Sequence, residues 1–180
     1  MRFNKEAPIY SAFIIAYLVI ITILRWQLEW VMLSFWLGAF VGALLYNADH
    51  LAYLLFQSPN EPTAVRLRNF LGNGNFKECA NLLLTTCHER KRLVAHSVIF
   101  QLVLVVLAFF ALSSSNSLFG KGMVIGLFLY SLINQGLALA REGNLDSWFW
   151  QVGIKPDKKG EAFYYLLLVL VLLYFSWMLI

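Results

Sequence analysis

Residues 30–56 read WVMLSFWLGAFVGALLYNADHLAYLLF, and this uninterrupted apolar run decides the fold class. About 20 such residues suffice for an α-helix to cross the hydrocarbon core of a bilayer. Four further apolar runs occupy residues 9–24, 93–112, 123–140 and 163–180. They are solid runs of Leu, Val, Ile and Phe, without the alternation of a membrane β-barrel, and helices satisfy their own backbone polar groups in lipid. The sequence therefore predicts an all-α integral membrane protein, a bundle of about five transmembrane helices forming a single polytopic domain.

The composition excludes a soluble domain. Of the 180 residues, 60% are apolar and 13% are charged, against roughly 45–50% and 25% in soluble proteins. A soluble domain of this size buries only about two-thirds of its surface, so the excess apolar surface must face the lipid bilayer. The basic start and first apolar run could indicate a cleavable signal peptide, but RWQLEW follows instead of a small-residue cleavage site, so we expect a retained helix.

The distribution of Lys and Arg predicts the orientation. With the N-terminus inside, 12 of the 14 basic residues fall in inner segments, and only Arg25 and Lys121 fall outside. Because short inner loops carry the excess of basic residues, we expect a cytoplasmic N-terminus in a multi-pass arrangement. The basic balance then reflects topology and contact with anionic lipid, and no nucleic acid partner is expected.

Residues 57–92 form the one long loop, predicted to be cytoplasmic and helical. A short helix should begin near Pro62 and end before Gly72, followed by a second amphipathic helix, FKECANLLLTTCHERKR, at the membrane surface or continuous with the third span. This loop is also the expected surface for a protein partner. The spacing of Cys79, Cys87 and His88 does not match a structural zinc site, so packing cysteines are expected.

Two other patterns admit simple structural interpretations. Gly38 and Gly42 have the small-xxx-small spacing that lets another helix approach closely, either within the chain or between two copies. Trp148, Phe149 and Trp150 lie in the loop after the fourth span, where aromatic residues typically anchor a protein at the headgroup level.

Polar residues inside the spans are the informative exceptions, because charged groups are expensive in a bilayer. At 1.5 Å per residue, Asp49 lies about 10 Å from the inner end of the second span, and Asn134 lies at about the same depth in the fourth. His96 is somewhat shallower. The full set on the three spans is Asn47, Asp49, His50, His96, Ser97, Tyr130, Ser131, Asn134 and Gln135.

This common depth predicts one cluster, with two interpretations. The first is a layer of interhelical hydrogen bonds that only holds the helices together. The second is a site open to the cytoplasm for one divalent metal ion (zinc, manganese or magnesium), with ligands from Asp49, His50, His96, Asn47 and Asn134.

Three segments resemble the YdjM-like family, LexA-regulated bacterial inner-membrane proteins classed as predicted metal-dependent hydrolases. The segments are GALLYNADH (42–50), KRLVAHSVIF (91–100) and GLFLYSLIN (126–134), in the family's order. The family's motifs are Asp-x-Asp-His, His-Arg-x-x-Thr-His-Ser and Gly-x-x-x-His-x-x-x-Asp. The resemblance implies location in the bacterial inner membrane.

The resemblance also implies a function. Asp49 and His96 would carry the catalysis, with a metal ion activating water against a phosphoester or lipid-linked substrate. However, Asn47 and Asn134 stand where the family has acids, and Lys91 and Tyr130 where it has histidines. The chain then looks like a divergent or inactive member.

Two classes of function remain open at this stage. One is a membrane-bound metal-dependent hydrolase, and the other is a non-catalytic membrane subunit or scaffold of a larger complex. A transporter is less favoured, because the sequence has no repeats and no helices interrupted by Gly or Pro. The sequence does not decide whether the protein is an enzyme.

Overall fold

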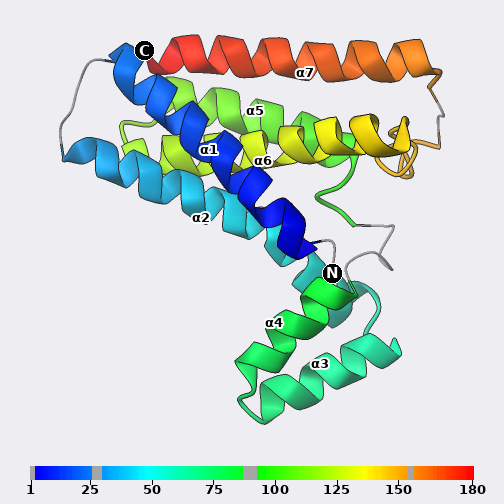
Figure 1. The fold of residues 1–180 in the computed structure, drawn as a ribbon. Helices are drawn as coiled ribbons and strands as arrows, with labels where there is room; N and C mark the ends of the chain where they lie inside the picture. The colour runs from blue at the N-terminus through cyan, green and yellow to red at the C-terminus, as the bar shows by residue number, and fades with distance from the viewer. Residues whose placement is uncertain (1–2, 26–29, 87–92, 154–155) are drawn as a thin grey trace.

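A computed structural model describes residues 3–25, 30–86, 93–153 and 156–180, and every regular element in these ranges is helical (Figure 1). A single π-helical turn, η1, extends the second helix. In chain order the elements are α1 (Phe3–Arg25), α2 (Val31–Ala52), η1 (Tyr53–Gln57), α3 (Pro62–Gly72), α4 (Phe76–Thr85), α5 (Val98–Ser114), α6 (Leu118–Glu142) and α7 (Lys158–Leu179).

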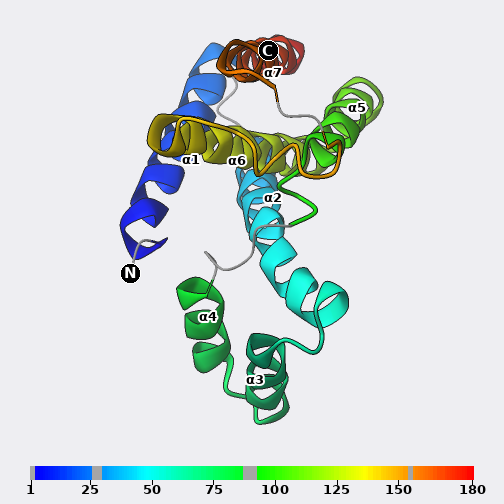
Figure 2. The same cartoon turned by 90° about the vertical axis from the view of Figure 1, so that its right-hand side faces the viewer.

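The bundle is built around α6, which contacts α1, α2, α5 and α7. Side-chain contacts fix the directions. Tyr10 near the start of α1 bonds to Asn134 near the end of α6, whereas Thr22 near the end of α1 bonds to Trp36 near the start of α2. Helices α1, α5 and α7 therefore run one way and α2 and α6 the other. One end of the bundle, here called the polar end, gathers the starts of α1, α5 and α7 with the ends of α2 and α6 (Figures 1 and 2).

Helices α2 and α6 run parallel and in very close contact through glycines on both. A Cβ at Gly42 would come within 2.9 Å of the backbone nitrogen of Leu127 and even closer to the Met123 carbonyl. A Cβ at Gly126 would similarly meet the backbone of Ala39. The small-residue spacing in α2 thus serves packing within the chain.

The outward faces of the helices are apolar, which identifies a multi-pass membrane protein. Four helices are long and apolar enough to cross a bilayer: Pro8–Arg25, Val31–Gln57, Leu118–Glu142 and Lys158–Leu179. Helix α5 is equally apolar but has 17 residues.

Several helices extend beyond the apolar runs that predicted them. Helix α6 begins after Ser117, whose hydroxyl accepts a hydrogen bond from the Gly120 backbone, and ends at Gly143, which has a left-handed conformation. Helix α7 begins after Asp157, whose carboxylate caps the Gly160 amide. Polar caps set helix ends, whereas an apolar run marks only the lipid-facing part.

Between α2 and α5, helices α3 and α4 form a hairpin that projects beyond the end of α2 (Figure 2). Its small core is separate from the bundle and consists of Leu54, Ala64, Leu67 and Cys79. The predicted start at Pro62 is confirmed. Gly72 proves to be the last residue of α3, because the left-handed turn follows at Gly74.

The helix of the third apolar run begins later than residue 93, where that run starts. Residues 93–97 are not helical, and α5 starts at Val98 with Ser97 as its cap. Helix α4 ends at Thr85, so the alternative of one helix continuing into the third span is wrong. Cys87, His88, Arg90, Lys91 and Arg92 lie outside the described residues.

Candidate polar site at one end of the bundle

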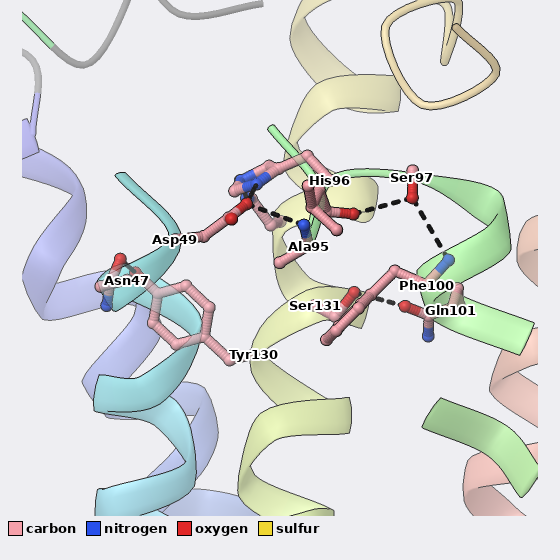
Figure 3. Close-up of polar contacts among 11 residues, drawn as sticks. Asn47, Asp49, Ala95, His96, Ser97, Phe100, Gln101, Tyr130 and Ser131 are labelled. Carbon is pink, nitrogen blue, oxygen red and sulfur yellow. Dashed lines mark hydrogen bonds and ion pairs between the residues drawn. The ribbon is translucent and has the colours of Figure 1, made fainter. Parts of the chain in front are cut away.

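Asp49 connects α2 to the segment that precedes α5. Its carboxylate oxygen Oδ2 accepts a hydrogen bond of 2.7 Å from the backbone N–H of Ala95 (Figure 3). The same oxygen lies 3.7 Å from Nδ1 of His96, an electrostatic contact too long for a strong hydrogen bond. The Asp49 side chain is 12% exposed, so the carboxylate is largely sheltered from solvent. It therefore serves as the anchor for non-helical residues 93–97.

His96 lies in that anchored segment rather than on a helix. The next residue, Ser97, fixes the start of α5: its hydroxyl donates to the Val94 carbonyl and accepts from the Phe100 N–H (Figure 3). A side chain placed just before a helix can reach across the bundle end. His96 thereby meets α2 through Asp49 and α6 through Asn134.

Asn134 contacts His96 and Tyr10 through the two polar atoms of its side chain. Its side-chain nitrogen lies 2.8 Å from His96 Nε2, and its oxygen accepts a hydrogen bond of 3.0 Å from the Tyr10 hydroxyl. With the amide nitrogen donating, His96 Nε2 accepts, and the ring proton of a neutral histidine then resides on Nδ1, facing Asp49. The order Tyr10–Asn134–His96–Asp49 is thus a directed chain across three helices.

Aromatic rings surround this chain. The His96 ring centroid lies 4.8 Å from that of Tyr46, 5.3 Å from that of Trp148 and 5.6 Å from that of His50. The structure therefore brings together Asp49, His50 and His96 with Asn134, as their common depth predicted.

Asn47 does not join this group directly. Its oxygen accepts a hydrogen bond of 3.0 Å from the Tyr130 hydroxyl, and its nitrogen donates to the Ala43 carbonyl one turn earlier. Tyr130 in turn stacks on Tyr10 at 4.7 Å. Asn47 is therefore linked to the His96 cluster indirectly, through Tyr130, whose ring contacts both Tyr10 and Tyr46.

The interfacial-anchor interpretation of Trp148 is wrong, because this side chain is 2% exposed and packs on the His96 ring. Its carbonyl accepts from the Val98 N–H at 3.0 Å. The same turn is held by Glu161 in α7, whose carboxylate accepts from the Leu145 N–H at 2.9 Å. Backbone contacts of this kind leave no periodic signal in a sequence, so the sequence predicts neither the role of Glu161 nor the buried position of Trp148.

The donor groups as arranged do not fit a divalent metal ion. Among the described residues, no three His, Cys, Asp or Glu side chains are gathered closely enough to hold one. Asp49 brings the cluster's one carboxylate and already accepts from Ala95, while His96 Nε2 is engaged by Asn134. A dication in a low-dielectric bundle needs more anionic ligands to offset its lost hydration.

The contacts around His96 connect helices through hydrogen bonds. Ser97 is next to His96 in the sequence, and its hydroxyl caps α5 and does not contact the imidazole ring as an activated nucleophile would.

Comparison with protein-family models, with curated proteins and with solved structures found no match to this chain. Its function must therefore be argued from the site itself.

Proposed function

We propose that this chain is a non-catalytic five-span protein of the bacterial inner membrane, an inactive relative of metal-dependent hydrolases that acts as a membrane subunit or scaffold. One observation carries the proposal: Asn134 engages the His96 nitrogen that a metal would need, and Asp49 secures the backbone at Ala95. These residues hold α1, α2, α5 and α6 together. Such interhelical hydrogen bonds each contribute roughly 0.6–1.7 kcal/mol in membrane proteins.

Five spans agree with the alternating directions of the bundle helices. Helix α5 covers about 25 Å at 1.5 Å per residue, and residues 93–97 extend it toward the bilayer surface. Both long loops then leave from the polar end, where most of the Lys and Arg lie in the sequence. The positive-inside rule places this end in the cytoplasm.

The α3–α4 hairpin supplies the surface for a protein partner in this proposal. Phe76 is 71% exposed and Val65 is 48% exposed, although the hairpin has its own small core. We expect these side chains to form part of an apolar contact with the partner. Scaffolding requires such a surface and no reaction chemistry.

A metal-dependent hydrolase is the second candidate, favoured by two neighbouring imidazole rings and by the Asp49 carboxylate 3.7 Å from one of them. The rings of His50 and His96 are 5.6 Å apart, close enough for both residues to be rearranged around one ion. Zinc, manganese or magnesium would then activate water toward a phosphoester or lipid-linked substrate. Rotation of the Asn134 amide would be required first, because it now occupies His96 Nε2.

Metal content and phosphoesterase activity of the purified protein separate the two candidates. We expect substoichiometric zinc, manganese and magnesium, and no turnover of bis-p-nitrophenyl phosphate. Stoichiometric metal and turnover that are lost in Asp49→Asn would instead establish the hydrolase. The matched control is Asp146→Asn, the same chemical change at an exposed turn residue.

A further inference from the structure

A second group of polar side chains lies on the adjacent face of α6, between α5 and α7. Ser131 and Gln135 follow directly after Tyr130 and Asn134 in the sequence, so they form a second stripe about 100° around the helix. The Ser131 hydroxyl donates to the Gln101 oxygen of α5 at 2.6 Å (Figure 3). The Tyr164 hydroxyl of α7 lies beside the Gln135 side chain without a well-directed hydrogen bond.

This group is buried yet leaves much of its hydrogen-bonding capacity unused. Gln101 and Gln135 are 0% exposed and Glu161 is 2% exposed. Within the described ranges, no hydrogen bond of good geometry is made by the Gln101 nitrogen, by either polar atom of Gln135, by the Tyr164 hydroxyl or by Glu161 Oε2, although Tyr164 and Gln135 are neighbours. Buried polar groups in native proteins are nearly always satisfied, by protein or by ordered water.

The two stripes meet at Tyr46. This side chain is 1% exposed, and its hydroxyl lies beside both Asn134 and Ser131. It also has no well-directed hydrogen bond among the described residues. Polar groups therefore continue from the His96 cluster, through Tyr46, to the side chains between α5, α6 and α7.

We propose that the junction of α5, α6 and α7 is an internal binding site for ordered water, held by Gln101, Gln135, Tyr164 and Glu161. The unused groups include both donors and acceptors: the two amide nitrogens donate, while Glu161 Oε2 and the Gln135 oxygen accept. A cation would satisfy the acceptors but would face the N–H groups of both glutamines. Water donates and accepts, and bridges groups that lie too far apart for direct contact.

With water at this site, the polar groups form one continuous layer with a carboxylate at each end. Asp49 lies in the last turns of α2, and Glu161 lies in the first turn of α7. Both belong to the polar end of the bundle, so the water serves one side of the protein and does not form a path across the membrane. In addition, Glu161 holds the turn at Leu145 that leads to Trp148, which connects this water site to the ring packed on His96.

Water-edited solid-state NMR of the unmodified protein in bilayers, with ¹⁵N-labelled glutamine side chains, tests the site directly. We expect the Gln101 and Gln135 amides to receive magnetisation from water as rapidly as exposed Gln57. Transfer as slow as that expected for a dry core would overturn the proposal. Signals are assigned by replacing each glutamine with methionine, which has a similar shape but no hydrogen-bonding amide.

The stability of Gln135→Met gives an independent answer. If water satisfies Gln135, the variant loses those hydrogen bonds, and we expect a lower midpoint of unfolding. If the amide is dry and unsatisfied, methionine removes a buried polar penalty and the midpoint rises. An unchanged or raised midpoint would therefore contradict the site. Gln57→Met is the control and should leave the midpoint unchanged.

Discussion

Replacing Asn134 with leucine, which has the same number and branching of side-chain heavy atoms, removes the centre of the chain Tyr10–Asn134–His96–Asp49. Two contacts are lost: the bond of 3.0 Å from the Tyr10 hydroxyl and the contact of 2.8 Å with His96 Nε2. His96 Nε2 is then left facing an apolar side chain. A buried polar group deprived of its partner costs about 1–3 kcal/mol.

We therefore expect Asn134→Leu to lower the free energy of unfolding by about 1–3 kcal/mol. A double-mutant cycle isolates one contact. Tyr10→Phe removes only the hydroxyl, so its coupling with Asn134→Leu should be about 0.6–1.7 kcal/mol, the range from the average to the largest value for hydrogen bonds between membrane helices. Reversible unfolding in mixed micelles, or steric trapping in bicelles, supplies the free energies.

Tyr17 provides the matched control, because it lies on the same helix and its hydroxyl bonds to Ser176 of α7 at 2.8 Å. Tyr17→Phe should be additive with Asn134→Leu to within about 0.5 kcal/mol, as expected for sites without shared partners. The reasoning is refuted if Tyr10 couples no more strongly to Asn134 than Tyr17 does.

Three further outcomes are expected. Gly126→Ala should destabilise the protein by about 1–3 kcal/mol through overpacking between α2 and α6, whereas Gly72→Ala, with open space around it, should change stability by no more than about 0.5 kcal/mol in thermal unfolding. With both native cysteines replaced by alanine, a membrane-impermeant thiol reagent on intact cells should label Asn116→Cys but not Asn75→Cys, and the reverse pattern would overturn the orientation. Asn134→Asp adds a carboxylate beside His96 and should raise zinc affinity about tenfold, which is about 1.4 kcal/mol, in a competition titration. Unchanged affinity would show that the cluster does not lack negative charge.

The class of fold and the depth of the polar residues could be predicted from the sequence, because both depend on which side chains are stable in lipid. Apolar runs identify helices in lipid, and costly polar residues stand out against them. The glycines of α2 also predicted a close helix contact. Their partner could not be identified, since small-residue spacing is the same for a neighbouring helix of the chain and for a second copy.

The position of His96 could not be predicted from periodicity. Residues 93–97 have helix-compatible composition, but the Ala95 N–H bonds to Asp49 and Ser97 caps the next helix, so the backbone remains non-helical. A bond to a backbone N–H does not depend on the side chain at Ala95 and leaves no mark there. Trp148 illustrates the same limit, because buried and interfacial tryptophans are the same residue type in the sequence.

The asparagine at position 134 also explains how hydrogen bonds hold the cluster together. An amide can donate to His96 Nε2 and accept from the Tyr10 hydroxyl at the same time, which matches the two contacts observed. An ionised acid at position 134 could only accept hydrogen bonds. His96 would then have to carry a proton on Nε2, or a cation would have to lie between the acid and the ring. Asn134 therefore satisfies Tyr10 and His96 together and adds no charge beside Asp49. A hydrogen-bonded connection between helices needs no further charge at this position, whereas a metal-dependent hydrolase needs the negative charge that an acid would supply.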